Sequence, residues 1–122
     1  MIIKFSNNKE YPVCSTGDYS TRVIPSNNPN IRSQMHVYMT MDTMTFEEFI
    51  NLFTDEANLE TITFKGETFE NMYENYTVVQ SVGKELVTEV DFTTGEVISE
   101  YRLVAKLEQL TYIEQKLKEL GL

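Results

Sequence analysis

The chain has 122 residues and a mass of 14.2 kDa, which is the size of one domain and leaves no material for a second core. Hydrophobic residues make up 41% and charged residues 24%, with few Gly and Pro, so a disordered or collagen-like chain is excluded. The net charge is −9, and residues 42–100 hold fourteen acidic but only two basic residues, a composition that disfavours nucleic-acid binding. We therefore expect one domain over residues 1–122.

The first forty residues predict short antiparallel strands. Residues 2–5 and 11–15 are rich in β-formers and flank an Asn-rich turn, which indicates a hairpin. Another strand is expected within residues 19–24, followed by a loop at 25–30 that contains two Pro and three Asn. Residues 31–41 alternate strictly between apolar and polar side chains, which predicts a half-buried strand. Its apolar face would hold Ile31, Met35, Val37, Met39 and Met41, together with Ser33.

At residues 45–53 the spacing of apolar residues changes from every second residue, as in a strand, to about every 3.6 residues, as in a helix. Thr45 and Glu48 have the spacing of a capping box, and Phe46, Phe49, Ile50 and Phe53 recur at helical intervals. This pattern predicts a short helix whose aromatic face packs on a sheet, with residues 55–58 as its exit loop.

Several β-rich segments fill the second half of the chain. Residues 61–64 and 68–69 predict two strands around Gly66, and three more segments are expected at 77–82, 86–92 and 97–105. Gly83-Lys84 and Thr93-Thr94-Gly95 would be the two turns of an antiparallel meander. The predicted class is thus α+β: a mainly antiparallel sheet, open barrel or sandwich of six to eight strands.

Two interpretations fit the C-terminus. Either a strand continues to about residue 107 and a helix begins at the capping box Thr111-Glu114, or a helix runs unbroken from Tyr101. The β-branched residues at 97, 98 and 104 favour the first. The helix over residues 110–120 carries an apolar seam that either packs on the domain or binds another chain; its members are Leu110, Ile113, Leu117 and Leu120.

No residue pattern indicates catalysis, a metal or a cofactor. His36 is the only histidine and Cys14 the only cysteine, and neither stands in a nucleophile motif, so a solvated or satisfied histidine and a buried thiol are expected. The acidic residues around Asp55 lack the order of a calcium loop, although the acidic middle of the chain leaves cation binding open. We predict that the protein is not an enzyme and needs no cofactor.

An aromatic group is the remaining candidate site. Tyr73 and Tyr76, with Phe69 and Met72 nearby, would suit a surface that contacts a protein or a sugar, and core packing explains the same residues.

No apolar run reaches the length of a membrane span, and the N-terminus lacks a signal-peptide core, so neither membrane insertion nor secretion is expected.

Four segments together resemble small proteins encoded by prophages and bacteriophages of Gram-positive gut bacteria. They are MIIKFSNNKEYPV, TFEEFINLFTDEANLETITF, YENYTVVQSV and YRLVAKLEQLTYIEQKLKEL. The resemblance lies in order and pattern, and it implies a structural or adaptor protein of the tail or baseplate. Its partners would be other phage structural proteins or further copies of itself, in the bacterial cytoplasm during assembly and then in the virion. The alternative is a small module that binds a carbohydrate or protein through an aromatic patch.

Overall fold

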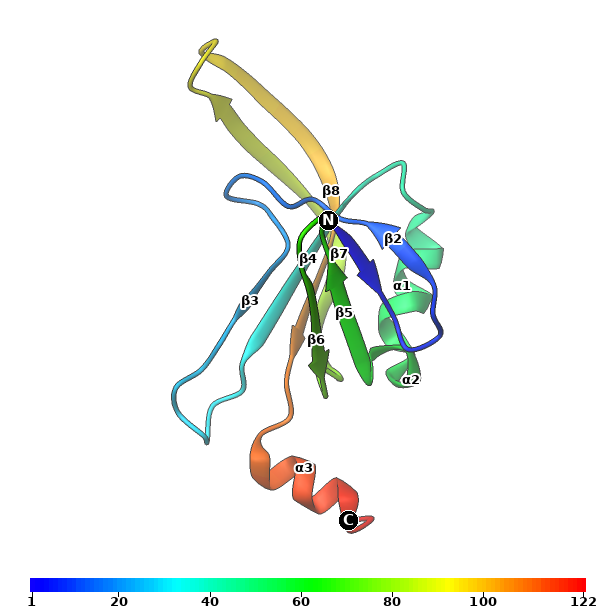
Figure 1. The fold of residues 1–122 in the computed structure, drawn as a ribbon. Helices are drawn as coiled ribbons and strands as arrows, with labels where there is room; N and C mark the ends of the chain where they lie inside the picture. Colours follow the sequence, from blue (N-terminus) through cyan, green and yellow to red (C-terminus); the bar gives the residue numbers. More distant parts are fainter.

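The computed structural model describes residues 1–122 and contains eight strands and three helices (Figure 1). The strands form two four-stranded sheets, and every strand pair is antiparallel. The predicted class, a mainly antiparallel α+β fold, is therefore confirmed. Neither sheet closes into a barrel. No helix is long and apolar enough to cross a lipid bilayer.

The first sheet, here the N-terminal sheet, has the strand order β2-β1-β5-β6. Its strands are β1 (Ile2–Lys4), β2 (Glu10–Pro12), β5 (Thr61–Lys65) and β6 (Glu70–Glu74). The predicted β1–β2 hairpin is present, and its turn places Asn8 at a positive φ of 68°, a conformation that Asn adopts more readily than most residues.

The second sheet, here the long sheet, has the order β3-β4-β8-β7. Its strands are β3 (Arg22–Ile24), β4 (Gln34–Thr40), β7 (Val78–Asp91) and β8 (Glu96–Glu108). The predicted turn at Gly83-Lys84 is wrong, because β7 continues through both residues and pairs Gly83 with Val104. Two long strands thus replace the predicted meander of three, and at 14 and 13 residues they are more than twice the usual length.

One apolar core joins the inward faces of both sheets to the first helix. On the long sheet it contains Met35, Val37 and Met39 of β4, opposite Leu107, Ala105 and Leu103 of β8. The alternation of residues 31–41 therefore predicted the three central buried residues correctly. It was wrong for Ile31 and Met41, which lie outside β4 and are exposed. The opposite face is less open than predicted, because Tyr38 is also buried there against Val87 and Val104.

Helix α1 (Phe46–Thr54) closes the core where the capping box predicted it. The Thr45 hydroxyl accepts a hydrogen bond from the Glu48 backbone N–H, and the rings of Phe49 and Phe53 lie fully buried, 4.8 Å apart. The segment after it was predicted as a loop but forms the short helix α2 (Glu56–Leu59), because the Asp55 carboxylate caps the N–H of Ala57 and Leu59 enters the core.

The last strand and helix follow the first of the two C-terminal interpretations. Strand β8 ends at Glu108, and helix α3 (Tyr112–Glu119) begins at a complete capping box formed by Thr111 and Glu114. No residue of α3 is buried. The helix lies beyond the lower end of the sheets, at the opposite end of the molecule from the β7–β8 turn (Figure 1).

Candidate interaction surfaces

The most prominent surface feature is a two-stranded arm that projects from the long sheet (Figure 1). Strand β4 supports β8 only as far as the pair Thr40–Arg102, and beyond it β7 and β8 pair with each other alone. We call residues 86–101 the arm. Its turn is closed by the Asp91 carboxylate, which accepts from the N–H of Thr93 and Thr94, and by Gly95 at a φ of +72°.

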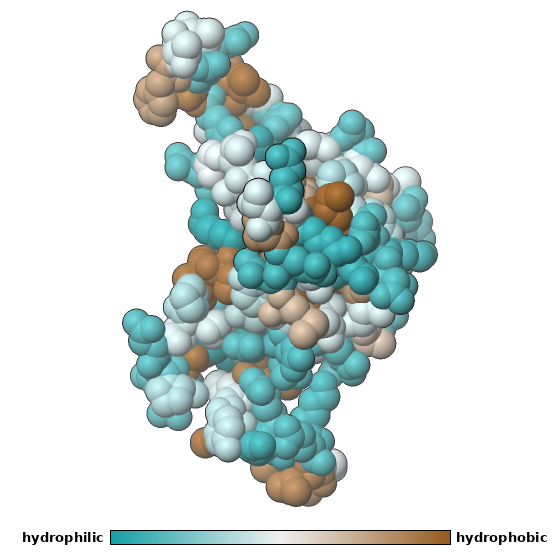
Figure 2. Space-filling view, viewed as in Figure 1, coloured by the Kyte–Doolittle hydropathy of each residue, from teal (hydrophilic) through white to brown (hydrophobic).

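The inner face of the arm continues the core face of the long sheet into solvent. Cross-strand partners share a face, so the arm pairs Leu86–Tyr101, Thr88–Ser99 and Val90–Val97 follow the buried Leu103 outward. Leu86, Tyr101, Val90 and Val97 are all exposed, and the tip residue Phe92 is 97% exposed. Figure 2 shows apolar residues at this upper end of the molecule. The arm therefore presents an uncovered apolar strip.

The outer face of the arm is covered at its base. Arg102, only 9% exposed, donates to the backbone oxygen of Tyr19 at 2.6 Å and to the Glu100 carboxylate at 2.8 and 2.9 Å. Its guanidinium also lies 3.5 Å from the Glu89 carboxylate. This network fastens the loop before β3 over the outer face, where Val87 is buried. The two faces of the arm thus differ, because the loop before β3 covers the base of the outer face and nothing covers the inner face.

Charge on the arm is of one sign. Residues 86–101 contain Glu89, Asp91, Glu96 and Glu100 and no Lys or Arg. Glu89 and Glu100 pair with Arg102 at the base, whereas Asp91 and Glu96, near the tip, form no ion pair within the chain. The arm is therefore an acidic projection, and the two carboxylates without a cation partner, Asp91 and Glu96, lie beside its exposed apolar tip.

Helix α3 is held to the body by ion pairs instead of by core packing. The Arg32 guanidinium binds both oxygens of the Glu114 carboxylate, at 2.6 and 3.0 Å. This bond, and the N–H that Thr111 donates to the same carboxylate, lower the pKa of Glu114 from 4.5 to about 2. A longer pair joins Lys118 to Glu56 at 3.5 Å. The helix is positioned but not buried.

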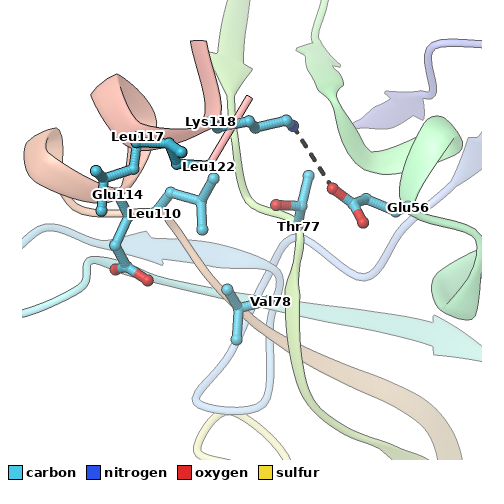
Figure 3. A pocket seen from close by; sticks show the side chains of 8 residues that line it. All are labelled: Glu56, Thr77, Val78, Leu110, Glu114, Leu117, Lys118 and Leu122. Carbon is cyan, nitrogen blue, oxygen red and sulfur yellow. Dashed lines mark ion pairs between the residues drawn. The ribbon is translucent and has the colours of Figure 1, made fainter. Parts of the chain in front are cut away.

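The predicted seam of α3 lies largely in solvent. Ile113 is 61% and Leu120 73% exposed, Leu117 is also exposed, and Leu110 is partly covered. Beneath the helix is an open groove of about 380 Å³, in which Leu110, Leu117 and Leu122 face Val78 across from the Lys118–Glu56 pair (Figure 3). The seam is accessible, as an interface requires, and its use as one stays a prediction.

The predicted aromatic group is not brought together at the surface. Tyr76 is 3% exposed and belongs to the core, where its ring packs edge-on against Tyr73 at 6.1 Å. Tyr73 itself is half-buried against Phe64. Met72 and Phe69 are exposed on and beside β6. A shared Tyr73–Tyr76 binding surface is therefore absent, because the second ring points into the protein.

The remaining candidates, His36 and Cys14, are both partly buried. His36 lies on the outer face of the long sheet, where its Nε2 is 3.2 Å from Gln34 Oε1 but its Nδ1 is buried without a partner, so the expectation of a fully satisfied histidine is wrong. Its pKa is lowered by partial burial and by the nearby cations Lys106 and Arg22. Burial raises the pKa of the Cys14 thiol, which packs beside Tyr38. No group of three or more His, Cys, Asp or Glu side chains is arranged to hold a metal ion.

Sequence reasoning found the α3 seam but missed the arm. The signal was present in the alternating residues of segments 86–92 and 97–105, which were correctly expected as strands. The arm was missed because the turn expected at Gly83 divided one long strand into two short ones. Comparison with protein-family models, with curated proteins and with solved structures found no match to the chain.

Proposed function

We propose that the protein is a non-enzymatic structural or adaptor component of a phage tail or baseplate, and that it acts through protein–protein contacts. The observation that carries the proposal is the arm, a two-stranded acidic projection with an uncovered apolar strip. An isolated two-stranded ribbon is at best marginally stable in water, and contiguous exposed apolar residues mark binding surfaces. A partner that covers the strip would supply the missing layer.

A second observation supports the same role. The apolar seam of α3 is exposed at the end of the molecule opposite the arm, so the chain offers apolar surfaces in two directions (Figures 1 and 2). A component that joins neighbours on both sides needs such surfaces, and symmetry in a particle multiplies contacts that are individually weak. The phage setting comes from the sequence resemblance, which implies assembly in the bacterial cytoplasm and then a place in the virion.

The proposal is tested by co-expressing the chain with the proteins encoded beside its gene and purifying it through a tag. We expect tail or baseplate proteins to be encoded there and to copurify. The matched variant replaces residues 90–97 by a two-residue turn between the paired residues Glu89 and Ile98, which removes the outer half of the arm. It keeps Val87 and both carboxylates that bind Arg102, so the base of the arm stays intact. Neighbouring genes for metabolic enzymes, or equal copurification of the folded short-arm variant, would contradict the proposal.

A further inference from the structure

The inner face of the arm and the apolar seam of α3 are both uncovered, and one is a sheet face while the other is a helix face. Within the body, the inner face of the long sheet is covered by α1, whose Phe49 and Phe53 share the core with Leu103. The arm extends that same face outward with no helix over it. Helix α3 is the converse, because Ile113 and Leu120 of its apolar seam are exposed, and an open groove separates Leu117 from Val78 at the start of β7. The arm lacks a covering helix, and α3 lacks a sheet face packed closely against its seam.

These two elements cannot meet within one chain. The arm projects from one end of the long sheet, and α3 lies beyond the other end (Figure 1). Arg32 holds α3 at its end through Glu114, and Arg102 anchors the base of the arm at the other. Any contact between the arm and α3 therefore joins two different copies.

We propose that the arm of one copy packs its inner face on α3 of a second copy, so that identical chains associate head to tail. The inference rests on the proposed function and specifies the partner of the arm. In this contact Val90, Val97 and Phe92 of one chain cover Ile113 and Leu120 of the next, in the way that α1 covers the sheet in the body. Such a contact is heterologous, so it produces a ring when the rotation closes and a filament when it does not.

Charge favours this pairing over the symmetric alternatives. The arm has four carboxylates and no cation, so packing one arm against another would bring two acidic ribbons together. Around α3, by contrast, the charges balance, because Arg32, Lys116 and Lys118 pair with Glu114, Glu119 and Glu56, so this end does not repel an acidic arm as a second arm would. The two lysines have only long pairs with exposed carboxylates, at 3.3 and 3.5 Å, so they can turn to the acidic tip of an incoming arm.

The size of the surfaces sets the expected strength. Stable interfaces use about 20–30 residues a side. Here the arm supplies the 16 residues of 86–101 and the helical end supplies the 11 residues of 112–122. The contact is therefore below standard size, and we expect a dissociation constant of about 10–100 µM for each junction. Closure of a ring would make the whole assembly tighter than any single junction.

Sedimentation velocity of the full chain from about 1 to about 500 µM tests the inference, because this range brackets the expected constant. Wild type should grow beyond dimers as its concentration rises. Val97→Glu places a charge on the inner face of the arm, and Ile98→Glu places the same charge on the outer face one residue later. We expect Val97→Glu to weaken association at least about tenfold and Ile98→Glu to leave it within about twofold.

Mixing two variants gives the decisive result. Leu120→Glu removes the α3 surface but leaves the arm intact, so it should be monomeric alone, as Val97→Glu should be. A mixture of the two contains one intact arm and one intact α3 seam, and it should form a 1:1 dimer that grows no further. Both side chains are exposed, so we expect each variant to keep the wild-type fold, which circular dichroism checks.

Three outcomes would overturn the inference. The first is a wild-type chain that stays monomeric at every concentration. The second is association that only Val97→Glu disrupts, which would indicate that two arms pack together. The third is association that only Leu120→Glu disrupts, which would indicate that two α3 helices pack together. None of them contradicts the proposed function, whose test is copurification with other phage proteins. Conversely, head-to-tail association without such copurification would support this inference and refute the phage role.

Discussion

Deleting α3 tests whether this helix stabilises the fold or serves as an interface. We consider a chain that ends at Leu110, because the Leu110 N–H donates to the backbone oxygen of Asn75 and should be kept. This truncation removes no buried residue, since the deleted segment 111–122 contains none. We therefore expect the truncated chain to fold.

The magnitude follows from the contacts that are lost. The Arg32–Glu114 pair has both oxygens bound but is about one-third exposed, so its loss lowers the free energy of unfolding by about 1 kcal/mol. The exposed Lys118–Glu56 pair contributes close to nothing, and opening the groove over Leu110 and Val78 adds about 0.5–1 kcal/mol. Together these losses amount to about 1–2 kcal/mol.

Differential scanning calorimetry measures the result. For a chain of this size, 1–2 kcal/mol corresponds to a decrease in Tm of about 4–8 °C, and the transition should stay cooperative. A truncated chain that is unfolded, or that has lost more than about 4 kcal/mol, would refute the reasoning and make α3 part of the folding unit. A small decrease in stability accompanied by loss of self-association would place the helix at an interface.

Three further predictions concern the core, the arm base and pH. Phe53→Ala should lower the free energy of unfolding by about 3–5 kcal/mol in urea denaturation, because the ring is fully buried; a loss below about 1 kcal/mol would contradict the packing. Arg102→Leu should lower it by about 3 kcal/mol and release the loop around Tyr19, seen as loss of its amide protection, since nearby carboxylates lose their buried partner. The pKa of Glu114 in the folded protein is about 2, below its usual value of 4.5, so the bond to Arg32 stabilises α3 fully above pH 4.5. This stabilisation is lost as the pH falls from 4.5 to 2. An NMR titration of the Glu114 carboxyl measures the pKa, and a midpoint near 4.5 would show that the pair does not form.

The parts of the fold that depend on local signals could be predicted from the sequence. Both capping boxes, at Thr45 and Thr111, marked helix starts correctly, because a side chain that caps its own helix needs no tertiary partner. The alternation around Met35 likewise identified the buried face of β4. In each case the determining interactions span only a few residues.

The parts that depend on distant residues could not be predicted. Gly83 has the composition of a turn, but pairing along the whole length of β8 keeps it extended, so the arm was hidden. For Tyr76 the sequence left a surface patch and core packing both open, and its place in the core cluster decides for packing. Tyr38 is buried by a loop that Arg102 fastens from the far end of the chain.

The unbroken passage of β7 and β8 from the core into the arm has a mechanical consequence. A pull along the arm is carried by both strands into the body, where the β4–β8 hydrogen bonds lie across the direction of load and share the force. A sideways push instead bends the ribbon about its root, where the buried guanidinium braces it. The projection would then behave as a cantilever, stiff in tension and compliant in flexure.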